Sequence, residues 1–136
     1  MPSVFSRIMN REIPGHFVHE DEQCVVIMTI QPFTQGHVLV IPREEIDCWE
    51  DVPAPLAQHL LTVSQRMAKV IKSEFSALRA GVLIAGVDID HLHIHIFPAN
   101  DASDFEFGKS TPQAASSEQL ADVAARLREA LANGGR

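Results

Sequence analysis

The sequence predicts an α+β domain built on an antiparallel sheet, and three observations lead to this prediction. Short apolar runs of strand length are separated by turn residues. One longer stretch, residues 53–75, carries apolar side chains mostly three and four positions apart, which is typical of an amphipathic helix. Residues 91–96 alternate between histidine and aliphatic side chains, the period of a strand with one buried face. Strands grouped around one long helix indicate the α+β class.

A short helix and three strands are expected before the long helix. The helix is predicted over residues 4–10 and is followed by a break at Pro14-Gly15. Pro32 and Gly36 punctuate a short loop between the second and third strands, so these two are expected to pair antiparallel. Four or five antiparallel strands are expected in all. Their predicted ranges are residues 17–20, 24–30, 37–41, 80–85 and 91–98.

The two later helices have recognisable starts. Asp51-Val52-Pro53 resembles the beginning of the long helix, because proline is tolerated in a first turn. Its apolar stripe consists of Leu56, Leu60, Val63, Met67, Val70, Phe75 and Leu78. Ser116 and Gln119 fit a capping box at the start of a last amphipathic helix. Residues 98–112, between the last strand and this helix, are expected to be irregular.

Length and composition indicate one domain with its own core. The chain has 136 residues and is 46% hydrophobic, so residues 1–136 are expected to fold as a single domain, with a core at 4–107 and a C-terminal helix at 116–132. The net charge of −7 and the lack of a basic patch argue against a nucleic-acid or acidic-membrane partner, although a local site can still bind a small anion.

Other features of the sequence favour a cytoplasmic protein. No apolar stretch approaches the ~20 residues of a membrane span, and the first residues lack a basic segment followed by an apolar run. Cys24 and Cys48 have no motif spacing and are expected to be reduced thiols.

His91, His93 and His95 are the residues whose pattern points to chemistry. On a strand they form a row on one face, about 6.5–7 Å apart, while the intervening aliphatic residues enter a core. Imidazole titrates near neutral pH, so one histidine can be a neutral nucleophile while its neighbour donates a proton. A histidine that attacks a phosphoryl group forms a phospho- or nucleotidyl-histidine, which water then cleaves.

Metal binding is the main alternative for this row, because histidine is a common zinc ligand. His93 and His95 can share one ion, but three histidines on one straight strand span too far to do so. The sequence also contains no Cys-x-x-Cys or Glu-x-x-His partner. We therefore expect no metal and no cofactor.

Residues 91–98, His-Leu-His-Ile-His-Ile-Phe-Pro, resemble the signature of the histidine triad (HIT) superfamily of nucleotide hydrolases and transferases. Residues 11–14, Arg-Glu-Ile-Pro, are similar to the Gly-Glu-Ile-Pro segment of that family. Residues 36–42, Gly-His-Val-Leu-Val-Ile-Pro, resemble its Gly-His-x-Leu-Val-Ile-Pro strand. The order of elements also agrees, so the resemblance covers about residues 4–107.

The resemblance implies a fold, a reaction and an assembly. The fold would be a five-stranded antiparallel sheet with helices, in a homodimer formed through the long helix and a strand edge. The substrates would be nucleoside monophosphates linked to an amine, a second nucleotide or a sugar phosphate. His93 would be the nucleophile at the α-phosphate, and His91 and His95 would orient the site and contact the phosphate or leaving group.

The resemblance also suggests positions that bind substrate. Thr29 stands where many members have a ribose-binding Asp, and Ala85 and Asp88 lie where an Asn and a Gln or Ser often hold the α-phosphate. With His37 and Ile27 they are the expected substrate-binding residues. Further candidates to wall the base, each with core packing as the alternative, are Phe5, Ile27, Ile30 and Val40.

Five further positions either differ from common family residues or leave two interpretations open. Glu45 replaces a fourth histidine found in many members. Ser3 and Ser6 stand where some members have the Cys-x-x-Cys of a structural zinc site, so no zinc is expected there. Asp88 and Asp90 either orient an imidazole and raise its pKa or are simply turn acids.

These observations predict an enzyme that cleaves a phosphoramidate or phosphoanhydride bond at the α-phosphate of a nucleotide through a nucleotidyl-His93 intermediate. Two alternatives stay open. One is a nucleotide-binding module of the same fold with little or no turnover, and the other is a metal-binding protein that uses His93 and His95.

Overall fold

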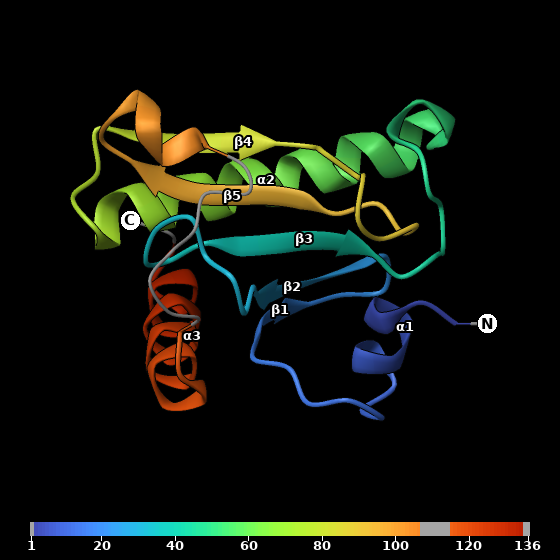
Figure 1. Ribbon diagram of the computed structural model, residues 1–136, viewed down its shortest axis with the longest axis horizontal. Coiled ribbons are helices and arrows are strands. Elements are labelled where there is room, and N and C mark those ends of the chain that lie inside the picture. Colours follow the sequence, from blue (N-terminus) through green and yellow to red (C-terminus); the bar gives the residue numbers. More distant parts are fainter. Residues whose placement is uncertain (1, 107–114, 135–136) are drawn as a thin grey trace.

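The computed structural model describes residues 2–106 and 115–134 and confirms the α+β class. One five-stranded antiparallel sheet has the strand order β1-β2-β3-β5-β4, and helices pack on it (Figure 1). The elements are α1 (Val4–Met9), β1 (Phe17–Glu20), β2 (Cys24–Met28), β3 (Val38–Pro42), η1 (Trp49–Asp51), α2 (Ala54–Glu74), β4 (Arg79–Leu83), β5 (Ile94–Ala99), η2 (Ala102–Phe105) and α3 (Ser117–Ala132).

The last strand begins later than its alternating sequence predicts. β3 and β5 pair with Val40 opposite Ile94 and Val38 opposite Ile96, so Leu92 would face Pro42 in this register. Proline has no N–H to donate to a ladder. The N–H of Leu92 instead donates to the carbonyl of Ile46 at 2.8 Å, and regular pairing starts at Ile94.

Part of the segment expected to be irregular is in fact regular. Pro98 and Ala99 complete β5, and η2 follows it, capped by a reciprocal pair of hydrogen bonds between Asp101 and Asp104. Residues beyond 106 in the predicted 98–112 segment lie outside the described residues.

The sheet has two differently covered faces because side chains alternate along each strand. α2 and α3 cover one face and form the main core with residues that include Val26, Val40 and Ile94 (Figure 1). Leu92 and Ile96 join this core, which confirms that the aliphatic residues between the histidines point inward. On the other face Phe5 of α1 packs in a smaller cluster with Val25, Ile27, Leu39 and Ile41.

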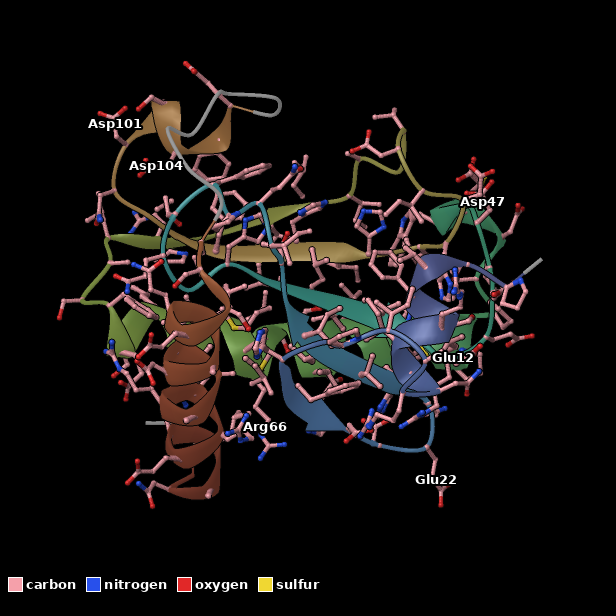
Figure 2. The ribbon with its side chains drawn as sticks, turned by 60° about the horizontal axis from the view of Figure 1, so that its bottom comes forward. Glu12, Glu22, Asp47, Arg66, Asp101 and Asp104 are labelled. Carbon is pink, nitrogen blue, oxygen red and sulfur yellow. The ribbon has the colours of Figure 1, made fainter. Side chains whose placement is uncertain are left out.

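Charged side chains lie around the outside of the molecule. Figure 2 places Asp101 and Asp104 at one end and Asp47 at the other, so these labelled acids do not form one patch. Among the residues that the structure describes, no helix combines the length and the apolar character needed to cross a membrane.

Candidate active site

Four buried histidines gather on the sheet face that α1 covers. In β3 and β5 Leu39 pairs with His95, so His95 shares the face of the small Phe5 cluster. His93 lies two positions earlier, its ring centroid 5.0 Å from that of Phe5 and 5.0 Å from that of His95. His37 and His91 are completely buried, and His93 and His95 are only 6% and 8% exposed. The alternation thus brings the three predicted histidines together under α1.

The tautomer of His93 follows from a contact with the backbone. Nδ1 of His93 lies 2.8 Å from the carbonyl oxygen of His91. A carbonyl oxygen only accepts, so Nδ1 carries the hydrogen and donates it. In the neutral ring the lone pair is then on Nε2, the nitrogen available for attack on an electrophile.

His37 fixes the tautomer of His95 in the same manner. The backbone N–H of Phe33 donates to Nδ1 of His37 at 2.9 Å, so the hydrogen of the neutral His37 ring is on Nε2. That Nε2–H lies 2.9 Å from Nδ1 of His95, which therefore accepts, and His95 carries its own hydrogen on Nε2. The hydrogen bond from His37 to His95 is therefore compatible with both rings being neutral.

Burial keeps both of these rings neutral. Burial, and then the charges of His95 and His93, lower the pKa of His37 to about 3. Burial, and then the charge of His93, lower the pKa of His95 to about 4, against a smaller opposing effect of Asp88. A donor hydrogen on Nε2 of His95 is thus retained on a neutral ring at physiological pH.

His91 is held by protein atoms at both ring nitrogens. Nε2 donates to the carbonyl oxygen of Pro42 at 2.8 Å, and the hydroxyl of Ser3 donates to Nδ1 at 2.6 Å. Burial lowers the pKa of His91, although the Pro42 bond and Glu45 oppose it. Both nitrogens of the neutral His91 ring thus bind protein atoms in this structure, and the expected contact of His91 with a phosphate or leaving group stays a prediction.

Ser3, Ser6 and Glu45 connect the start of α1 to His91. Ser3 Oγ accepts the N–H of Ser6 at 3.0 Å, which caps α1. Glu45 Oε1 accepts the N–H of Ser3 at 2.7 Å and the hydroxyl of Ser6 at 2.5 Å. The residues at the positions of the family's Cys-x-x-Cys and fourth histidine therefore form a hydrogen-bonded network with His91.

The other predicted substrate residues lie at different distances from this centre. Ile27 belongs to the Phe5 cluster, and Thr29 follows β2, with its N–H 3.4 Å from the carbonyl oxygen of His37. Ala85 and the exposed Asp88 lie between β4 and β5. His37 is fully buried against His95, so it positions that ring.

Among the candidate base-wall residues, Val40 does not share the site, while the place of Ile30 beside a base stays a prediction. Val40 packs in the main core beneath the helices, because it alternates with Leu39 and Ile41 along β3. Ile30 is 67% exposed in the loop after β2.

Sequence reasoning missed Phe33 as a neighbour of the histidines. Its ring is parallel to that of His95, at 4° and 5.7 Å between centroids, and lies edge-on to Phe97 at 5.0 Å. Phe33 stands in the loop between β2 and β3, where a single aromatic residue next to Pro32 carries no periodic pattern. The fold of the loop carries Phe33 to His95 and Phe97 of β5, and this depends on contacts between residues far apart in the sequence.

Comparison with known proteins gives consistent results. The sequence model of the family described as HIT domain matches residues 10–102. An uncharacterized HIT-like protein of Borreliella burgdorferi is 30% identical over 114 residues, which are 77% of this chain and 82% of that protein. The adenosine 5'-monophosphoramidase HNT1 of Saccharomyces cerevisiae is 29% identical over 99 residues, which are 72% of this chain and 63% of that protein.

A solved structure agrees with the fold. The HIT-like protein from Bartonella henselae, described as involved in cell-cycle regulation, superposes with a TM-score of 0.82 at 27% identity. The match covers 94% of this chain and 95% of that chain.

Proposed function

This chain belongs to the HIT family, and from that premise we propose that it is a nucleotide hydrolase or nucleotidyl transferase acting at the α-phosphate. The bond cleaved is a phosphoramidate or a phosphoanhydride. The observation that carries the proposal is the 2.8 Å hydrogen bond from Nδ1 of His93 to the carbonyl oxygen of His91, which leaves Nε2 as a lone-pair nucleophile.

In the first step Nε2 of His93 attacks the α-phosphorus. The bond from phosphorus to the leaving nitrogen or oxygen breaks, and its electron pair stays with that atom, which, when it is nitrogen, takes a proton from solvent. The ring becomes a nucleotidyl-imidazolium, whose Nδ1–H remains bonded to the His91 carbonyl, and this contact stabilises the positive charge. Water then attacks the phosphorus, the bond from phosphorus to Nε2 breaks with its electron pair returning to the ring, and the proton lost by the water passes to solvent as the monophosphate leaves. An alcohol or amine in place of water gives transfer.

The neighbouring histidines have separate roles in this reaction. The Nε2–H of His95 donates a hydrogen bond to an oxygen of the α-phosphate or to the leaving atom. His37 is a positioning residue that selects this tautomer of His95, and His91 positions the carbonyl that holds His93. No metal or cofactor is needed for these steps.

The name of a relative supports the choice of a phosphoramidate as first substrate. The yeast protein named adenosine 5'-monophosphoramidase matches 72% of this chain. A nucleotide-binding module with little turnover is the alternative, and Thr29 in place of a ribose-binding acid favours it, because its hydroxyl is already an acceptor for the N–H of Gln31 at 3.2 Å.

A turnover assay distinguishes these functions. Purified protein is mixed with AMP and GMP phosphoramidates and with dinucleoside polyphosphates, in EDTA, and release of the monophosphate is measured. We expect turnover by the natural chain and a loss of at least about a thousandfold in His93→Ala, because the nucleophile is removed. A rapid acid-free quench should also trap a nucleotidyl adduct on the peptide that contains His93.

His16→Ala is the matched control for loss of an imidazole. His16 is partly exposed, with Nε2 3.2 Å from the hydroxyl of Ser117 in α3, and we expect turnover equal to that of the natural chain. AMP binding without turnover in the natural chain would replace the hydrolase with the binding module. Turnover that survives in His93→Ala would remove His93 as the nucleophile.

A further inference from the structure

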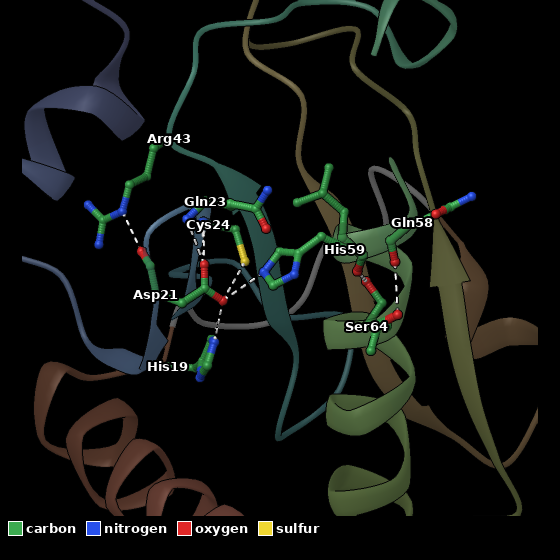
Figure 3. A network of polar contacts seen from close by, with 10 residues as sticks. His19, Asp21, Gln23, Cys24, Arg43, Gln58, His59 and Ser64 are labelled. Carbon is green, nitrogen blue, oxygen red and sulfur yellow. Dashed lines mark hydrogen bonds and ion pairs between the residues drawn. The ribbon is translucent and has the colours of Figure 1, made fainter. Parts of the chain in front are cut away.

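A second cluster of ligand-type side chains lies at the turn between β1 and β2. Figure 3 shows Oδ2 of Asp21 at its centre, facing His19, Cys24 and His59. Nε2 of His19 and Nε2 of His59 each lie 2.8 Å from this oxygen, and Sγ of Cys24 lies 3.5 Å from it. The donor atoms of His19, Asp21 and Cys24 all lie within 4.8 Å of one another.

We propose that His19, Asp21, Cys24 and His59 form a binding site for a divalent transition-metal ion of the zinc class. Two imidazoles, one thiolate and one carboxylate are all ligand types that zinc accepts in four-coordinate sites. The proposal is independent of the nucleotide chemistry, because it uses none of the triad residues.

The backbone builds this cluster in a specific way. β1 and β2 pair with an irregular register, in which Phe17 faces Ile27 but His19 faces Val26. This bulge places His19 on the sheet face of Val26, and Cys24 belongs to the same helix-covered core. His59 reaches the cluster from α2, which packs on that face.

The cluster therefore lies on the face of the sheet opposite the catalytic histidines. Val26, Val40 and Ile94 are paired across β2, β3 and β5 on the helix-covered side, and Ile27, Leu39 and His95 are paired on the side of α1. An ion here would be separated from His93 by the thickness of the sheet. Its expected effect is on stability, since it would join α2 to the β1–β2 turn.

Asp21 is already oriented to present one oxygen. Its Oδ1 accepts the N–H of Gln23 at 2.7 Å and the N–H of Cys24 at 2.8 Å, which fixes the carboxylate. Its Oδ2 then faces the three other donors. Arg43 binds the backbone carbonyl of Asp21 at 2.7 Å and lies on the opposite side of the turn from His59 (Figure 3).

Access and charge also suit a divalent ion. The side chains of His19, Asp21 and His59 are 22%, 26% and 31% exposed, so an ion can reach them, while Cys24 is completely buried behind them. Thiolate and carboxylate together balance two positive charges. Ideal zinc bond lengths place donors about 3.3–3.7 Å apart, so the two imidazoles would move out from Asp21 slightly, while Sγ of Cys24 already lies 3.5 Å from Oδ2 of Asp21.

Binding has a simple proton balance. The ion displaces the thiol proton of Cys24, which passes to solvent, and the Nε2 hydrogens of His19 and His59 are exchanged for hydrogens on Nδ1. Without an ion, His19, His59 and Cys24 simply donate hydrogen bonds to the carboxylate of Asp21. The experiment must distinguish this arrangement from a bound ion.

Cobalt titration of the reduced, chelator-treated chain is the test. We expect one equivalent of Co²⁺ to give the intense visible bands of a tetrahedral ion together with a thiolate-to-cobalt charge-transfer band. Competition with Zn²⁺ should remove them, and Zn²⁺ should raise the unfolding temperature by about 5 °C relative to EDTA.

Matched variants assign the site. Cys24→Ser should lose the charge-transfer band, and His59→Gln, which changes a partly exposed residue of α2, should weaken binding at least about tenfold. His59→Gln decides the question if Cys24→Ser does not fold. Cys48→Ser, at an exposed thiol, and His93→Ala, in the triad, should both bind cobalt as the natural chain does.

The proposal is overturned if the natural chain gives no tetrahedral bands, or if His59→Gln binds cobalt unchanged. It is also overturned if binding disappears in Cys48→Ser or His93→Ala, because the ion would then occupy a different site. Loss of turnover in His93→Ala with unchanged cobalt binding would support both proposals separately.

Discussion

Burial and hydrogen bonding give the histidines of this site different proton positions. His93 donates through Nδ1 to a backbone carbonyl, while His37 and His95 are linked ring to ring. A proton added to His95 would place hydrogens on both of its nitrogens, and Nδ1 could no longer accept from Nε2 of His37. The neutral state of the pair is therefore part of the folded structure.

Stability should consequently depend on pH through His37 and His95. Their folded pKa values, about 3 and about 4, lie below the ordinary value of 6.5, so the unfolded chain binds more protons between these limits. The free energy of unfolding therefore has its full value above about pH 6.5 and decreases as the pH falls. Each histidine contributes a slope of about 1.4 kcal/mol per pH unit within its window.

Urea unfolding at pH values of about 7, 6 and 5 measures this slope. His37→Gln should reduce the slope by the contribution of one proton, and the other histidines cancel in the difference between the two proteins. An unchanged slope in His37→Gln would show that this ring is not kept neutral by the fold.

The alternation of histidines was readable in the sequence, but their partners were not. The 91–96 pattern places aliphatic residues in the core and the triad on the opposite face, as the structure confirms. The bond between His37 and His95 joins residues 58 positions apart, and the bond between Ser3 and His91 joins residues 88 positions apart. Such pairs depend on strand register and on where α1 docks, which no local pattern encodes.

Elements with strong local patterns were predicted closely. Ser116 and Gln119 form the predicted capping box at the start of α3, and the periodic stretch at 53–75 is α2. Local sequence patterns did not predict features that depend on how two strands pair. The bulge in β1 depends on register with β2, because four residues are too few to reveal an irregular pairing by alternation.

Gly36 shows how one residue holds the loop between β2 and β3 against α2. Its φ is +100°, and a Cβ there would lie 2.5 Å from Cε2 of Phe75 at the end of α2. We expect Gly36→Ala to lower the free energy of unfolding by about 2–4 kcal/mol, through both a left-handed backbone and overpacking. Thermal or urea unfolding measures the change.

Gly86→Ala is the control for backbone strain alone. Gly86 also has a positive φ, +67°, but a Cβ there meets nothing within 4 Å. Its cost should be only about 1 kcal/mol. Equal costs for the two variants would mean that the contact with Phe75 contributes nothing.

At the scale of the whole molecule, the sheet leaves one apolar edge. β4 is the last strand in the order β1-β2-β3-β5-β4, and its Val82 is 54% exposed. Leu78, just before β4, is 61% exposed, and Leu61 of α2 is 44% exposed. An edge strand with apolar side chains is a template for pairing with another chain. The resemblance to the HIT superfamily implies a homodimer through the long helix and a strand edge, which is the same region.

We therefore expect two copies to associate along β4 and α2. Sedimentation equilibrium should give about twice the 15.0 kDa of the chain. Val82→Lys should weaken association at least about tenfold, because it places a charge where apolar surface would be buried. Val87→Lys is the matched control, since Val87 is 78% exposed but lies outside β4. A natural chain that sediments as a monomer, or a dimer that only Val87→Lys disrupts, would exclude this edge as the interface.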